Sequence, residues 1–133
     1  MAKVTPEIAK KEVEAWLDSK KIMQSVRDSN EDSTQLLIDA MVEGIITIDS
    51  SSHVITHNLN FPIGEGEEIK KLEYRPRLSD RLLEPYLKGV KPTDSDGRLI
   101  AYICALTQNS RGVIRNMDSV DKKISLAIAV FFL

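Results

Sequence analysis

Residues 44–61, which read GIITIDSSSHVITHNLNF, contain the change of pattern that decides the fold. After Gly44 the hydrophobic period becomes two, and β-branched residues dominate on both sides of the polar stretch 49–52. Alternation of this kind is typical of strands with one buried face, and a short polar run between two strands is typical of a turn. The pattern predicts a β-hairpin whose strands cover residues 45–48 and 54–61.

The side chains of the second strand are expected to divide between an inner and an outer face of the sheet. The predicted inner face holds His53, Ile55, His57, Leu59 and Phe61, and the predicted outer face holds Thr56, Asn58 and Asn60. Pro62 is typical of a strand end or a sheet edge. Leu72 and Tyr74 then alternate with charged residues, which predicts a third strand over residues 69–75.

The chain before the hairpin is predicted to be helical. Thr5 is a good N-cap, and an apolar stripe follows it until residues 18–21, where we expect the helix to bend or break. Asp32 or Ser33 is expected to cap a second helix, which Gly44 would end in a left-handed conformation.

Three further helices are predicted after the sheet. Each has a polar residue that can cap its first turn: Ser79 or Asp80, then Asp94 or Asp96, and finally Asp118, with Asp121 adding negative charge near the helix start. Residues 108–112 are expected to form a loop or a short turn. These patterns predict an α+β fold, with a small antiparallel sheet near residues 45–75 and helices before and after it on one face. Residues 1–44 form an N-terminal helical section and residues 45–133 an α+β section of one compact unit.

Composition narrows the classes of function. The 133 residues are 42% hydrophobic and 29% charged, which favours a folded domain over wholesale disorder. A formal charge of -2 argues against general nucleic-acid binding. The N-terminus lacks the apolar segment of a signal peptide, and the apolar run 124–133 is too short to cross a bilayer. We expect a cytoplasmic protein without a membrane partner.

No residue pattern points to catalysis. His53 and His57 lie four residues apart, about 13 Å on a strand, which is too far to share one metal ion. Cys104 lies among apolar residues, and Asp118 with Asp121 has the spacing of a capped helix start. We therefore expect no enzymatic activity, no cofactor and no metal site.

A basic cluster and the last helix remain as surfaces for partners. The cluster contains Arg75, Arg77, Arg81 and Lys88, with Tyr74 and Tyr86 between them. It could contact RNA or an acidic protein, but alternating acidic residues favour a solvated surface. The last helix is apolar nearly all round, so it must be buried on more than one side, within its own fold or against another chain.

Three short segments resemble the phage tail assembly chaperone family, of the Mu-like tail assembly type. They read LEYRPRLSD at residues 72–80, ALT at 105–107 and MDSVD at 117–121, and the resemblance covers roughly residues 54–133. Met117 and Leu78 depart from the family pattern, in which leucine and threonine are common, so the resemblance assigns no role to a threonine hydroxyl.

The resemblance implies a non-catalytic chaperone in the cytoplasm of a bacterial host. Such a protein binds the long helical tape-measure protein, keeps its apolar stripes from aggregating and helps to recruit tail-tube subunits. Homo-oligomers are possible. The candidate partner-binding residues lie at the C-terminus: Leu126, Val130, Phe131, Phe132 and Leu133. A virion structural component and a small nucleic-acid or protein-binding adaptor are the alternatives.

Overall fold

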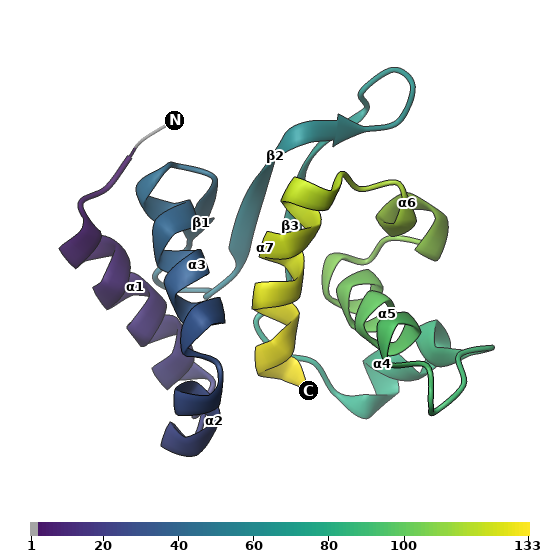
Figure 1. Ribbon diagram of the computed structural model, residues 1–133, viewed down its shortest axis with the longest axis horizontal. Helices are drawn as coiled ribbons and strands as arrows, with labels where there is room; N and C mark the ends of the chain where they lie inside the picture. The colour runs from purple at the N-terminus through teal and green to yellow at the C-terminus, as the bar shows by residue number, and fades with distance from the viewer. Residues whose placement is uncertain (1–2) are drawn as a thin grey trace.

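The computed structural model describes residues 3–133 and has the α+β architecture that the sequence predicts (Figure 1). Helices α1 (Pro6–Ser19), α2 (Gln24–Ser29) and α3 (Glu31–Val42) precede strands β1 (Ile46–Ile48), β2 (Ile55–Ile63) and β3 (Ile69–Tyr74). Helices α4 (Asp80–Leu87), α5 (Ser95–Thr107), α6 (Arg111–Arg115) and α7 (Ser119–Ala129) follow, and a 3-10 turn, η1 (Val130–Phe132), comes last.

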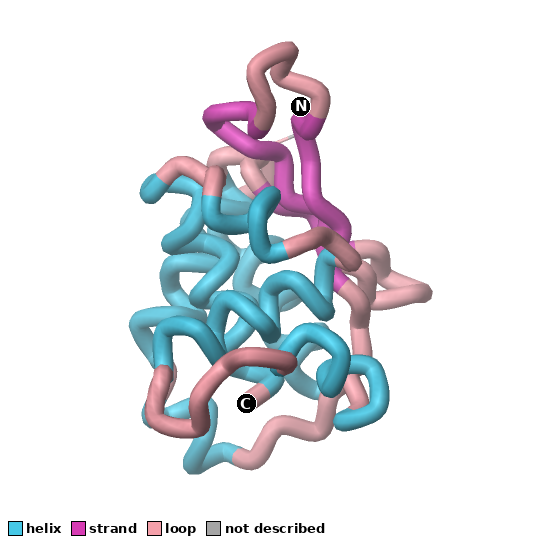
Figure 2. Tube along the Cα trace, turned by 90° about the vertical axis from the view of Figure 1, so that its right-hand side faces the viewer, coloured by secondary structure: helices cyan, strands magenta, loops and turns pink. Residues whose placement is uncertain are grey.

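The three strands form an antiparallel sheet in the order β1-β2-β3. His57 in the central strand lies opposite Ile46 on one side and Leu72 on the other. Helices α1 and α3 contact β1, α7 contacts β2 and α5 contacts β3. Figure 2 shows the strands at one side of the molecule and the helices gathered on the other. One face of the sheet is therefore covered by helices, as predicted.

Helix α7 occupies the centre of the helical layer (Figure 1). It packs against α3, α5 and β2, and it buries Ile124, Ala127, Ile128 and Ala129. The prediction that a helix apolar on nearly every side is buried on more than one side is confirmed, and its own fold supplies much of the cover.

The N-terminal helices belong to the same core. Ala9, Val13, Trp16 and Leu17 of α1 are all buried, and the Trp16 ring meets Phe131 edge to face with 5.9 Å between ring centroids. The Thr5 hydroxyl caps α1 by accepting from the Ile8 amide. These contacts join residues from opposite ends of the described chain.

One helix boundary agrees with the prediction and one differs. Helix α1 ends at Ser19, within the stretch 18–21 where it was expected to bend or break, and Lys21 adopts a left-handed conformation with φ of 56°. Helix α3 begins two or three residues earlier than expected, with Asn30 and not Asp32 or Ser33 at its N-cap. Glu31 and Asp32 instead lie in the first turn, where the helix dipole favours negative charge.

The later elements confirm the predicted caps and add a helix. Ser79, Asp94 and Asp118 each accept a hydrogen bond from the first turn of the following helix. The stretch 108–112, which was expected to be a loop or a short turn, includes the start of α6, which Ser110 caps by accepting from the Val113 amide. A helix of five residues is too short to show a hydrophobic period, so only the cap could have indicated it.

Strand β2 does not alternate along its whole length. Its pairing with β3 shifts between Asn58 and Ile63, which marks a bulge, and the strand continues through Pro62. Phe61 was expected on the inner face but is 53% exposed, because the extra residues turn its side chain outward. His53 was also expected on that face, but it lies before β2 in a left-handed turn with φ of 63°.

Candidate functional site

Asp121 is the polar anchor between α7 and the bulge in β2. Its carboxylate has no solvent exposure. One oxygen accepts from the Asn60 backbone amide at 2.9 Å and from the Asn60 side chain at 3.1 Å, and the other accepts from the Phe61 amide at 2.9 Å. A bulge leaves backbone donors without a ladder partner, and buried donors must be satisfied. Asp121 was expected to serve the start of its own helix, but its hydrogen bonds go to the sheet.

A second chain of polar contacts runs beside this anchor. His57 Nδ1 lies 3.1 Å from the Tyr74 hydroxyl, which is hydrogen-bonded to Ser125 in α7. The Ser125 hydroxyl also lies 3.4 Å from the Met117 sulfur. His57 and Ser125 have no solvent exposure, and Tyr74 is 1% exposed. Side chains from β2, β3 and α7 therefore meet inside the core.

The buried cluster keeps His57 neutral. Burial lowers the pKa of His57 to about 4, and the nearby Asp121 carboxylate opposes this change only in part. Nε2 lies 3.7 Å from an Asp121 oxygen, and that charge favours the tautomer with the proton on Nε2. Nδ1 then accepts from Tyr74, whose own pKa burial raises. Because these groups are enclosed, the cluster fixes the position of α7 and offers no open site for a substrate.

The other residues considered for chemistry stay apart from this cluster. Cys104 is buried in α5, and burial raises the pKa of its thiol. Asp118 caps α7 by accepting a hydrogen bond from the Val120 amide. Within residues 3–133, no group of three or more histidine, cysteine, aspartate or glutamate side chains is placed to hold a metal ion.

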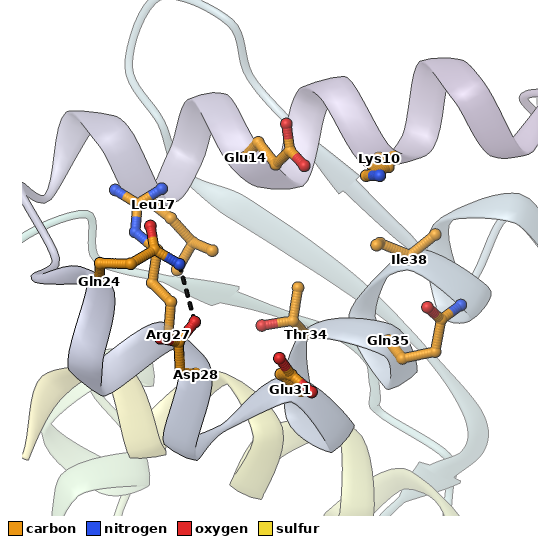
Figure 3. Close-up of a pocket in the computed structure, with 10 residues that line it drawn as sticks. All are labelled: Lys10, Glu14, Leu17, Gln24, Arg27, Asp28, Glu31, Thr34, Gln35 and Ile38. Carbon is orange, nitrogen blue, oxygen red and sulfur yellow. Dashed lines mark hydrogen bonds between the residues drawn. The ribbon is translucent and has the colours of Figure 1, made fainter.

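A polar groove lies between α1, α2 and α3 and has a volume of about 560 Å³ (Figure 3). Leu17 and Ile38 are its apolar lining residues, and charged residues of both signs surround them. Arg27, its one arginine, pairs with Asp18 at 2.8 Å, and Gln24 donates to Asp28 at 2.8 Å. These local pairs and the mixed charge give the groove no preference for one class of ligand.

A second groove, between α3 and α7, is almost entirely apolar. Two adjoining hollows of about 250 and 260 Å³ share Leu36 of α3 and Lys123 of α7. Their apolar lining comes from Leu36, Ala40, Ile45, Val120, Ile124, Leu126, Ala127 and Val130. We call this surface the α3/α7 groove. It includes two of the five candidate partner-binding residues, Leu126 and Val130.

The charges around the α3/α7 groove are mainly negative. Asp39 and Glu43 line one hollow and Asp32 the other, while Lys123 is the basic residue common to both. From Val120 to Val130 the groove follows α7 for about 15 Å at the rise of a helix. Its length and apolar character suit about three turns of a partner helix with basic residues at its margins.

The remaining candidate residues at the C-terminus have different surroundings. Phe131 is 4% exposed and packs on Trp16, so it belongs to the core of the monomer and not to an exposed surface. The Phe132 ring lies under Lys20, whose Nζ is 3.2 Å from the ring centroid. Leu133 is 69% exposed. Burial and the Arg77 charge lower the pKa of Lys20 to about 8.

The basic cluster does not form an uninterrupted basic face. Arg77, Arg81 and Lys88 are exposed, whereas Arg75 is half-buried. The exposed acidic residues Asp80 and Glu84 alternate with them along the chain. Long-range attraction of a nucleic acid requires segregated positive charge, so this surface gives no specific support to nucleic-acid binding.

Comparisons with known proteins add no relationship. No protein-family model matches the chain, and no curated protein or solved structure shows significant similarity to it. None of the helices in residues 3–133 is long and apolar enough to cross a membrane.

Proposed function

We propose that the protein is a non-catalytic phage or prophage tail assembly chaperone that acts in the cytoplasm of the bacterial host. It would bind an apolar stripe of the helical tape-measure protein and hold that stripe in solution until tail-tube subunits replace the chaperone. The choice of partner comes from the sequence resemblance at residues 72–80, 105–107 and 117–121. The structural observation that supports the proposal is the apolar α3/α7 groove.

The groove suits a chaperone because a partner helix can bind to it and then dissociate. Leu126 and Val130 are only half-buried, so a partner helix can gain apolar contact without any unfolding of the core. The buried Asp121 cluster holds α7 in place while its other side stays available. A groove of about three turns limits the contact area, which favours reversible binding over a permanent complex.

Co-expression with a tape-measure segment tests the proposal. The wild-type protein should raise the soluble fraction of that segment, and the purified proteins should form a complex in calorimetry. The double variant Leu126→Asp with Val130→Asp should bind at least roughly tenfold more weakly, because it places two carboxylates in an apolar contact. Leu82→Asp is the matched control, since Leu82 is 41% exposed on α4, outside the groove.

Three results would contradict the proposal. The wild-type protein could leave the segment insoluble, or the double variant could bind as well as the control. The protein could also remain in purified mature particles, which would favour a virion structural component over a chaperone. Deletion of residues 130–133 is a poor substitute for the point variants, because it removes the buried Phe131 from the core.

A further inference from the structure

Strand β3 forms one edge of the three-stranded sheet, next to an open hollow. The hollow has a volume of about 880 Å³ and is lined by residues 68–73 on one side and 107–109 on the other. An unpaired edge offers backbone donors and acceptors to another strand. The hollow follows β3 over nearly its whole length, so it has room along the edge for a short extended segment.

The backbone groups that point outward from β3 follow from the pairing inside the sheet. The Asn58 amide donates to Ile45, so the backbone of Asn58 faces β1 and that of its neighbour His57 faces β3. Leu72, opposite His57, therefore faces β2. Its neighbours Lys71 and Glu73 then direct their amide and carbonyl groups toward the hollow.

Arg75, the next outward-facing residue, supports this assignment and marks the end of the free edge. The Arg75 amide donates to the Leu106 carbonyl at 2.9 Å, on the outer side of β3. Within residues 3–133, no comparable bond occupies the outer groups of Lys71 and Glu73. An added strand can thus pair with residues 69–73 but must leave the edge before Arg75. A second copy of β3, paired antiparallel with Lys71 opposite Glu73, would place its Ile69 opposite Arg75, whose outer amide is already bonded to Leu106. A flexible segment can turn away before that point.

The exposed side chains at this edge favour a partner strand of complementary charge. Lys71 and Glu73 are both exposed and lie on the same face, two residues apart. Residues directly opposite on antiparallel strands interact, so opposite charges stabilise the pair and like charges weaken it. Lysines on an edge also discourage indiscriminate strand pairing. The edge therefore excludes most apolar strands and accepts a segment of complementary charge.

We propose that β3 binds an extended peptide segment antiparallel to itself, with a basic residue opposite Glu73 and an acidic residue opposite Lys71. Read along the bound segment, its motif is a lysine or arginine, any residue, then an aspartate or glutamate. The segment adds a fourth strand to the sheet. This inference concerns a different surface from the α3/α7 groove and does not depend on the chaperone proposal.

Fluorescence anisotropy with labelled seven-residue peptides tests the motif. The probe carries lysine at position 2, glutamate at position 4 and valine or threonine elsewhere, and the matched probe exchanges the two charges. The first probe should bind roughly tenfold more tightly than the second. The double variant Lys71→Glu with Glu73→Lys should reverse this preference. Lys11→Glu with Glu14→Lys, an exposed exchange on α1, should leave it unchanged.

Amide hydrogen exchange provides a readout specific to strand addition. Saturation with the first probe should slow exchange at Lys71 and Glu73, while Leu72 and Tyr74, which already face β2, should change little. Absence of binding by either probe, equal binding of both, or unchanged exchange at Lys71 and Glu73 would each overturn the proposal. Preference of the wild type for the second probe would overturn the antiparallel orientation.

Discussion

The two sides of α7 meet their neighbours in different ways. Toward the sheet, Asp121 and Ser125 are fully buried and make directional hydrogen bonds to β2 and β3. Toward α3, Leu126 and Val130 stay half-buried along an apolar groove. Directional polar contacts define one position for the helix, whereas apolar contacts tolerate many partners. One side of α7 therefore fixes the position of the helix, whereas the other side presents a partly exposed apolar surface.

The largest expected difference in stability is between a buried and an exposed residue at the C-terminus, Phe131 and Leu133. Phe131→Ala should lower the free energy of unfolding by about 3–5 kcal/mol, because Phe131 fills the core against Trp16. Leu133→Ala should have almost no effect, since Leu133 is 69% exposed. Urea unfolding followed by circular dichroism measures both. Similar losses of stability for the two variants would show that Phe131 does not contribute more to the core than Leu133.

The sheet-facing side of α7 should make stability depend on pH. The folded-state pKa of His57 is about 4 and its ordinary value is 6.5, so the unfolded chain binds more protons between these pH values. Stability should fall by about 3 kcal/mol as the pH decreases from 6.5 to 4. His57→Asn should lack this part of the pH dependence and should also be less stable at neutral pH, because it removes the buried contact with Tyr74. Parallel pH curves for the two proteins would contradict the assignment.

A smaller effect should distinguish the two aspartates of α7. Asp121→Asn should lower the free energy of unfolding by about 2 kcal/mol, because the amide places a donor where Phe61 or Asn60 needs an acceptor. Asp118→Ala removes a single exposed cap and should cost about 1 kcal/mol. Thermal unfolding of the two variants under identical conditions gives the comparison. An equal or reversed order would show that the β2 bulge does not need Asp121.

Local sequence patterns predicted most of the helices and strands. Features that depend on contacts between distant residues could not be predicted from those patterns. The hairpin followed from alternation after Gly44, and the caps Thr5, Ser79 and Asp118 followed from residue type. The bulge in β2 could not be predicted in this way, because the donors of Asn60 and Phe61 are satisfied 60 or 61 positions further along the chain. Alternation assumes that pairing continues unshifted, so it misplaced Phe61.

The same distinction applies to the candidate binding residues. An apolar helix with Leu126 and Val130 on a separate side could be recognised from its period, and the α3/α7 groove contains both. Whether Phe131 is exposed to a partner or buried in the core could not be predicted, because Trp16 lies far away in the sequence and no local pattern links the two rings. Which partner fills the groove is likewise a property of surfaces and not of periodicity.

The contact between Trp16 and Phe131 also constrains the order of events during synthesis. A ribosome makes the chain from its N-terminus, so α1 emerges long before the aromatic ring against which its tryptophan packs. Until residue 131 leaves the exit tunnel, the Trp16 indole lacks the aromatic neighbour against which it packs in the folded domain. The contact therefore delays completion of this part of the core until residue 131 has been translated and has left the tunnel.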